Sequence, residues 1–227
     1  MVTFMKFFPS TTLSEQIANH LGDKITRLEY RPGERIVETK VAEELGVSQS
    51  PVREALRILE KRRLVKLVAR HGTFVSEITE DFIESMFDIF QELVGLATRK
   101  TVKNATESDV ENILALFKDM EKCYNERDVF KFNNAYFEWG LYCLKCAYDP
   151  ILEEMILDLV PSIRRIEYMS LMKREIEGLS AVYSYIKNAA ERIKARDAEG
   201  AEMNNRMGTE SEKRLALEFF RSGALKF

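Results

Sequence analysis

Apolar and polar residues alternate along the first part of the chain with the spacing of short amphipathic helices. Residues 13–28 place apolar side chains three or four positions apart, which predicts a helix with one buried face. Residues 38–45, ETKVAEEL, repeat this pattern over a shorter span. Pro32 and Gly33 lie between the two segments and favour a turn. The expected buried positions are Leu13, Ile17, Leu21, Ile25 and Leu28 in the first helix, and Val41, Ala42 and Leu45 in the second.

The stretch GVSQSPVREAL, residues 46–56, predicts a turn followed by a third helix. Gly46 favours the turn, and either Ser48 or Ser50 suits the N-cap of the helix. Pro51 then falls within the first helical turn, where backbone N–H groups have no intrahelical acceptor in any case. The apolar face of this helix is Val52, Ala55, Leu56 and Leu59.

Two β-prone runs come next, Leu64–Val68 and Thr73–Val75, on either side of His71 and Gly72. This arrangement predicts a β-hairpin. Three helices followed by a two-stranded hairpin form a winged helix-turn-helix, which we expect over residues 1–78.

The pattern from Thr79 onward is helical throughout, and strand-like alternation is absent. Thr79, Thr106 and Asp197 are suited to N-cap positions. We therefore expect an all-helical bundle over residues 79–227 and a chain that is mainly α. The predicted helices cover residues 79–103, 106–124, 128–147, 150–172, 176–196 and 197–221.

Composition adds that the two parts differ in charge. Residues 1–78 carry a net charge of +3 and residues 79–227 a net charge of −6, which suits a small nucleic-acid-binding module joined to a different domain. No apolar run is long enough to span a membrane, and the first ten residues lack a signal-peptide core. Three cysteines without an export signal indicate free thiols, so a cytoplasmic protein is expected, without a membrane partner.

The third helix is the expected DNA-contacting element, because a helix-turn-helix inserts its second helix into the major groove. With its apolar face turned inward, Gln49, Ser50 and Arg53 project outward near its start. Gln can bond adenine and Arg can bond guanine, each through two hydrogen bonds. The remaining candidate DNA contacts are Ser48 beside the turn, Arg57 toward the phosphates, and Arg70, His71 and Gly72 at the tip of the hairpin.

Residues 30–75 resemble the DNA-binding domain of the GntR family of bacterial transcription regulators, through the segments PGERI, AEELGVSQSPVREAL and HGTFV. The resemblance implies a homodimer that binds a double-stranded inverted-repeat operator and a small-molecule effector bound by the C-terminal domain. Carried over by position, Thr39, Gln49, Ser50, Arg53 and the His71-Gly72 tip are the DNA contacts. Many relatives have Arg in place of Gln49, and often Arg in place of Thr39, so the operator sequence is expected to differ.

The helical second half resembles the FadR subfamily, in which many bundles hold a divalent metal through one Asp and three His. This chain has only His20 and His71, both in the first half. Tyr136 and Gly140 fall at the positions of the Asp and the first His when CAYDPIL is matched to the corresponding family segment. We therefore expect no metal site and no cofactor.

Phe90 and Val94 stand where relatives commonly carry Arg and Glu. An apolar pocket with an apolar or acyl-type effector is one interpretation, and a filled domain that serves only dimerisation is the other. The candidate effector-binding residues are Phe90, Val94, Asn133, Tyr136, Arg164, Arg165 and Tyr183, with Asn134, Glu138 and Tyr185 as further polar candidates. Either adjacent arginine would suit a carboxylate or a phosphate.

An enzyme is disfavoured by the inventory of residues. The second half has no histidine for a helical di-iron site, and the chain has no nucleophile elbow or Gly-rich phosphate loop. Cys143 and Cys146 are spaced like a metal or redox pair but fall inside a predicted helix, where small buried thiols are the simpler interpretation. The sequence thus favours a ligand-responsive transcription regulator, more often a repressor in this family, over an effector-free DNA-binding protein.

Overall fold

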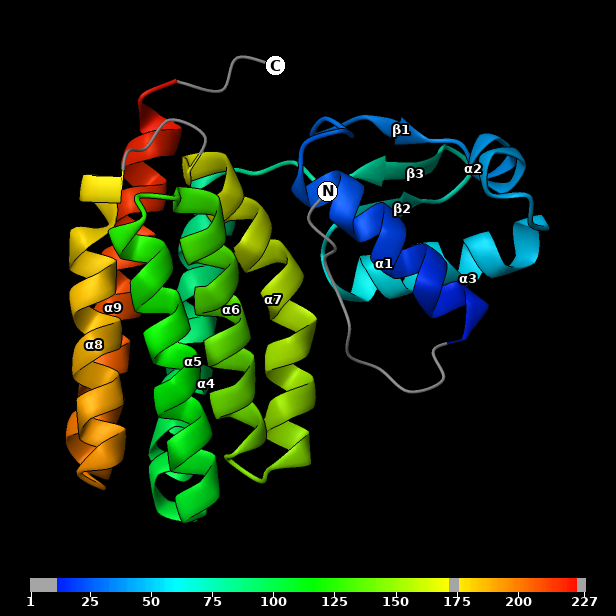
Figure 1. Ribbon diagram of the computed structural model, residues 1–227. Helices are drawn as coiled ribbons and strands as arrows, with labels where there is room; N and C mark the ends of the chain where they lie inside the picture. The colour runs from blue at the N-terminus through cyan, green and yellow to red at the C-terminus, as the bar shows by residue number, and fades with distance from the viewer. Residues whose placement is uncertain (1–11, 172–175, 224–227) are drawn as a thin grey trace. The chain divides into compact units, whose positions relative to one another are not determined.

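The computed structural model describes residues 12–171 and 176–223, and the chain divides into two compact units. The first unit ends at Glu77 and the second begins at Ile78, one residue before the boundary expected from the sequence. The mainly α fold class is confirmed: the first unit combines helices with a small sheet and the second is helical (Figure 1).

The first unit is a winged helix-turn-helix. Its elements are α1 (Leu13–Thr26), β1 (Arg35–Ile36), α2 (Glu38–Leu45), α3 (Gln49–Lys61), β2 (Val65–Val68) and β3 (Gly72–Val75). Thr12 caps α1 in a capping box with Glu15, a pair of residue types that is typical of the start of a helix. The predicted inner face of α3 is buried, because Val52, Ala55, Leu56 and Leu59 pack with Ile17, Leu21 and Ile25 of α1.

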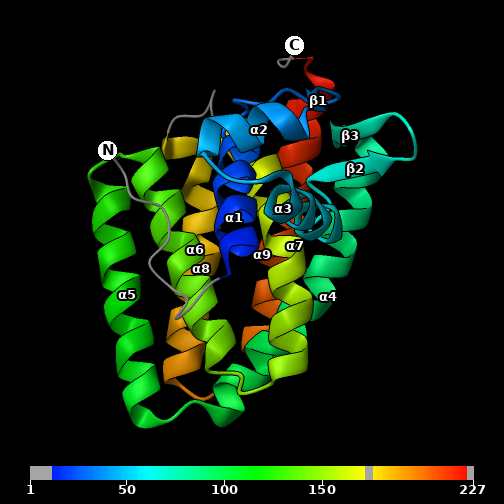
Figure 2. The same ribbon diagram turned by 90° about the vertical axis from the view of Figure 1, so that its right-hand side faces the viewer.

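The sheet has three antiparallel strands in the order β1-β3-β2, not the two of the predicted hairpin. Arg35 pairs with Phe74 and Ile36 with Thr73, so β1 adds a third strand beside β3. A strand of two residues shows no alternation in the sequence, which is why the pattern missed it. The loop between β2 and β3 projects as an open tip (Figure 2).

The second unit is a bundle built from α4 (Glu80–Asn104), α5 (Glu107–Asn125), α6 (Val129–Lys145), α7 (Pro150–Leu171), the short 3-10 turn η1 (Ile176–Leu179), α8 (Ser180–Lys194) and α9 (Ala198–Arg221). The expected N-caps are confirmed: the side chains of Thr79, Thr106 and Asp197 each accept a backbone N–H from the first turn. Among the described residues of this unit, the predicted helix over residues 176–196 departs from the structure, because η1 precedes α8; Met172, the predicted end of the helix over residues 150–172, lies outside the described residues.

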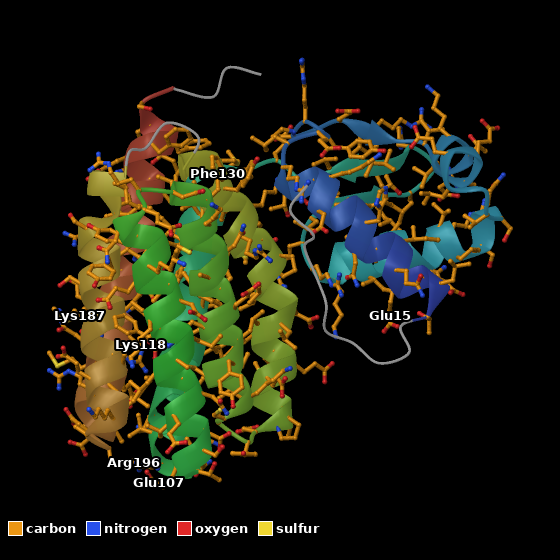
Figure 3. The ribbon with its side chains drawn as sticks, viewed as in Figure 1. Glu15, Glu107, Lys118, Phe130, Lys187 and Arg196 are labelled. Atoms are coloured by element: carbon orange, nitrogen blue, oxygen red, sulfur yellow. The ribbon has the colours of Figure 1, made fainter. Side chains whose placement is uncertain are left out.

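Helices α4 and α9 lie side by side and run antiparallel (Figure 1). Ion pairs connect them along their exposed edge, with Lys213 Nζ 2.8 Å from Asp88 and Arg221 Nε 2.8 Å from Glu80. At the opposite end of the bundle, Arg196 bonds Glu107 at 2.7 Å and donates to the carbonyls of Val102 and Ala105 (Figure 3). These contacts fix the helix ends around the apolar core.

None of the described helices has the length and apolar character needed to cross a membrane.

Candidate functional site

The start of α3 presents polar side chains to solvent. Gly46 ends α2 in the left-handed conformation, with φ 65°, and Ser48 then occupies the N-cap of α3. Ser48 therefore occupies the expected N-cap position, but its side chain makes no capping hydrogen bond. Ser48, Gln49 and Ser50 are all exposed, and Pro51 lies in the first turn as predicted. Their side-chain groups and the free N–H groups of this turn are available to an incoming polar partner.

Arg53 extends from α3 and is held by an acidic residue of α2. Its Nε donates to Glu38 at 2.6 Å, while 62% of the Arg53 side chain and 33% of the Glu38 side chain stay accessible. Thr39 is exposed next to Glu38, and Arg57 is exposed one turn beyond Arg53. The predicted α3 residues therefore lie on one accessible face together with Thr39, and Glu38 is an addition that the sequence did not single out.

The tip of the wing is a tight turn with unusual backbone angles. The N–H of His71 donates to Val68 O at 3.0 Å, Arg70 has φ 66° and Gly72 has φ 106°. His71 Nδ1 lies 2.9 Å from Ala69 O. All three predicted tip residues, Arg70, His71 and Gly72, are exposed.

Arg35 of β1 also lies at this tip, although no role was predicted for it from the sequence. A Cβ built on Gly72 would lie 3.1 Å from Arg35 Nε and 3.3 Å from its Nη2. The guanidinium thus lies against the strand at Gly72, where a Cβ would have to displace it slightly and where the positive φ favours glycine. Arg35 could be connected to the tip only through the third strand, which the pattern did not show.

A Gly72→Ala variant should lower the free energy of unfolding by about 1–2 kcal/mol, because an L-residue is disfavoured at this left-handed φ and its Cβ would press on Arg35. Urea denaturation measures this change. An Arg70→Gly variant is the matched control in the same turn, since glycine removes the side-chain penalty at φ 66° and should not destabilise. Equal losses in both variants would contradict this account of the turn.

The second unit contains a cavity of about 90 Å³ between its helices. Phe90, Val94 and Tyr136, three of the predicted effector residues, line it together with Gly140. The other walls come from α4, α6, α7, α8 and α9, and the polar side chains among them are Thr98, Thr101, Glu167, Asn205 and Thr209. The cavity is smaller than the roughly 300–1,000 Å³ of common ligand pockets, so a long acyl chain does not fit in this conformation.

The remaining predicted effector residues are not among those that line the cavity. Asn133 is partly buried on α6. Arg164 lies 4.7 Å from the centre of the Phe137 ring and donates to Asn134 at 3.5 Å. Arg165 is only 1% exposed, and burial lowers the pKa of its guanidinium to about 10. These contacts are structural ones within the bundle, and they give these residues no part in the cavity wall.

Tyr183 is likewise engaged elsewhere, in an aromatic stack. Its ring lies 4.1 Å from that of Tyr124, and its hydroxyl donates to Glu121 at 2.5 Å. Burial, followed by the hydrogen bond and the charge of Glu121, raises the pKa of Tyr183 to about 12. The hydroxyl therefore stays protonated and serves to join α5 and α8.

A buried carboxyl lies behind the cavity wall. Tyr136 donates its hydroxyl to Glu212 of α9, and Glu212 is 9% exposed. Burial raises the pKa of Glu212 from 4.5 to about 7, while the Tyr136 hydroxyl lowers it in part. Burial and the charges of Glu212 and Glu167 raise the pKa of Tyr136 well above 10.

Glu212, Glu167 and Asn205 were missed by the sequence interpretation. A signal was present for Glu212: Ala201, Gly208 and Ala216 are small residues seven or eight positions apart on α9, which marks a closely packed face. Glu212 lies four positions from Gly208 and from Ala216, on that same face.

Two protein-family models match the chain, one in each half. The model of the bacterial regulatory proteins of the gntR family matches residues 13–75, and the FCD domain model matches residues 85–205, more than half of the chain. The chain belongs to the GntR family and carries an FCD domain.

Relatives of this GntR-family chain are transcription regulators. The HTH-type transcriptional regulator YdhC of Bacillus subtilis is 29% identical over 157 residues, 67% of this chain and 70% of that protein. The gluconate operon transcriptional repressor of the same species is 28% identical over 169 residues, 67% of each chain. The solved structure of Escherichia coli McbR/YncC is 22% identical, covers 93% of this chain and 100% of that one, and shares its fold with a TM-score of 0.80.

This FCD domain departs from the metal-binding pattern named above. Tyr136 and Gly140 border the cavity at the positions where the resemblance implies an Asp and a His ligand. Among the described residues, no group of three or more His, Cys, Asp or Glu is placed to hold a metal ion. Tyr136 instead brings a hydroxyl that is bonded to Glu212.

Proposed function

We propose that this GntR-family regulator is a ligand-responsive repressor that acts in the cytoplasm as a homodimer on an inverted-repeat operator. The observation that carries the DNA-binding part is that α3, the start of α2 and the wing tip present accessible polar side chains, which we take together as the DNA-binding face. On it lie the proposed DNA contacts Thr39, Ser48, Gln49, Ser50, Arg53, Arg57, Arg70, His71 and Gly72. We add Arg35 to this set because its guanidinium lies against Gly72, and we assign Glu38 the role of holding Arg53 rather than of contacting DNA.

The contacts divide into two kinds by their chemistry. Gln49 and Arg53 present side chains that can bond base edges in the major groove, whereas Arg57 and the wing residues suit the sugar-phosphate backbone. In a homodimer, two copies of α3 would meet successive major grooves about one helical turn apart, at roughly 34–36 Å. A repressing role is supported by the likeness to the gluconate operon repressor.

The effector-binding part rests on the cavity of the FCD domain. A ligand there changes DNA affinity only if it binds one arrangement of the dimer more tightly than another. The small volume of about 90 Å³ favours a second candidate function, an effector-free DNA-binding protein whose FCD domain serves only dimerisation. DNA binding that responds to no small molecule would support that second candidate.

The DNA-binding proposal is tested by selecting duplexes from a random library and measuring affinity against salt by fluorescence anisotropy. The affinity should fall steeply with salt, because each neutralised phosphate contributes about −0.9 to the slope of log K against log [salt]. Arg57→Ala should reduce the magnitude of this slope by about 1 and weaken all sequences alike.

Lys122→Ala is the matched control for that measurement. Lys122 is also an exposed cation, with 75% of its side chain accessible, but it lies on α5 in the helical unit. The control should leave the slope unchanged. A chain that selects no duplex at all, or the same change of slope in both variants, would overturn the proposed DNA-binding face.

A further inference from the structure

We propose that the cavity of the helical unit binds a small organic cation, an ammonium group on a short apolar chain, rather than a carboxylate. This inference rests on the proposed effector site and specifies the chemistry of its ligand. It follows from which hydrogen-bonding groups around the cavity are already used, which are left over, and what charge surrounds them.

The hydroxyl and indole donors around the cavity are used within the protein. Thr98 donates to Val94 O at 2.8 Å and Thr101 to Cys143 O at 2.7 Å. Thr209 donates to Asn205 O at 3.1 Å, and Trp139 Nε1 donates to Ile113 O at 3.2 Å. The Tyr136 hydroxyl donates to Glu212. A carboxylate ligand needs donors, and these five are already committed.

Two buried acceptors are left over on the α9 side. Among the described residues, Asn205 Oδ1 and Glu212 Oε2 are buried and have no hydrogen-bond partner. Asn205 lines the cavity, and Glu212 is joined to its wall through Tyr136. Both lie on one face of α9, since they are seven positions apart. A buried acceptor without a partner costs free energy, so a ligand that donates a hydrogen bond to Asn205 Oδ1 is favoured, while the Glu212 carboxyl acts on the ligand through its charge.

The charged side chain among the residues found to line the cavity is a carboxyl group. Glu167 is part of the wall, and Glu212 lies behind Tyr136. The residues found to line the cavity include no Lys, Arg or His. An anion would be repelled by these carboxyl groups, whereas a cation would be attracted in a site where water screens poorly.

The rest of the wall suits a short apolar chain. Phe90, Phe137 and Trp139 contribute aromatic surface, and aromatic rings also attract cations. A volume of about 90 Å³ admits a molecule of a few carbon atoms.

The test compares three ligands that share one chain and differ in head group: butylamine, butan-1-ol and butyrate. Calorimetry and thermal shift on the full-length protein should show butylamine binding at least about tenfold more tightly than butyrate, with butan-1-ol between them. Tighter binding of butyrate, equal binding of all three, or binding of none of them would overturn the proposal.

Glu212→Gln identifies the group responsible. The variant should weaken butylamine about tenfold and leave butan-1-ol unchanged. Glu218→Gln, an exposed residue on the same helix, is the matched control and should change neither ligand. If Glu212→Gln fails to fold, the wild-type comparison of head groups still decides the question.

The pH dependence gives an independent readout. Among the described residues, Tyr136 of α6 acts on Glu212 and Glu167 of α7 acts on Tyr136, while Asp88 of α4 and Lys213 of α9 pair with each other at the edge. Since an ammonium favours the ionised carboxyl and the pKa of Glu212 is about 7, butylamine should bind more tightly as the pH rises through that value. Glu212→Gln should remove this dependence.

Anisotropy on a selected duplex, run on the same samples, separates this inference from the proposed function. Butylamine binding without any change in DNA affinity would support the ligand class and contradict the effector role. DNA affinity that responds to butyrate but not to butylamine would support the effector role and overturn the ligand class.

Discussion

An Arg53→Ala variant should lose about 1–3 kcal/mol of binding free energy at one base pair of each half-site, equivalent to roughly 5- to 150-fold in affinity. The expected position is a guanine, because the guanidinium matches its O6 and N7 atoms. The loss should be confined to duplexes that carry this guanine, and affinity for unrelated DNA should change little. Anisotropy with the selected duplex and its single-base variants measures both quantities.

A variant of Glu38 provides a second test of this role, because Arg53 must break its ion pair with Glu38 before it can bond a base. The 2.6 Å contact is an accessible ion pair, which costs at most about 1 kcal/mol to break. Glu38→Gln should therefore change affinity less than Arg53→Ala does. In a double-mutant cycle, the effect of Glu38→Gln should vanish once Arg53 is absent. An unchanged Glu38→Gln effect in the Arg53→Ala background would show that Glu38 contacts DNA on its own.

A Glu212→Gln variant should be more stable than the wild type above pH 7, by about 3 kcal/mol. Burial raises the pKa of Glu212 from 4.5 to about 7, and each unit of pKa corresponds to about 1.4 kcal/mol. Between these two values the folded protein keeps a proton that the unfolded chain has lost. The contribution of Glu212 to the free energy of unfolding therefore falls as the pH rises from 4.5 to 7 and is level above that.

Urea denaturation at a series of pH values measures this effect. The difference between Glu212→Gln and the wild type should grow across the window and then stay constant, whereas Glu218→Gln should follow the wild type throughout. A difference that is independent of pH would mean that the pKa of Glu212 is the same in the folded and the unfolded protein, and would contradict the shift caused by burial.

The starts of the helices could be predicted from the sequence because they depend on residues that are close together in the chain. Pro51 lies in the first turn of α3, and Thr79, Thr106 and Asp197 accept the N–H groups of the helices that they precede. Such signals act within one turn of helix, so spacing and residue type suffice to find them. The same holds for the apolar face of α3, whose period is that of a helix.

The cavity was predicted only in part, because its composition depends on contacts between distant residues. Phe90, Val94 and Tyr136 were found through the positions they share with the family pattern, and they line the cavity. Glu212 lies 76 positions after Tyr136. No local sequence pattern predicts a contact between a carboxyl and a hydroxyl that are so far apart in the chain. Tyr183 shows the converse, since stacking on Tyr124 takes it away from the cavity.

The pair of Arg53 and Glu38 also bears on how the regulator would search a genome. On random DNA the guanidinium can remain with Glu38, so it adds little to the attraction between the protein and the phosphates. Complexes at wrong sites would then dissociate sooner, and the arginine would be released only where a base compensates for its lost partner. Since a genome offers about 10⁶–10⁹ competing sites, weakening these encounters shortens the search without weakening the final complex.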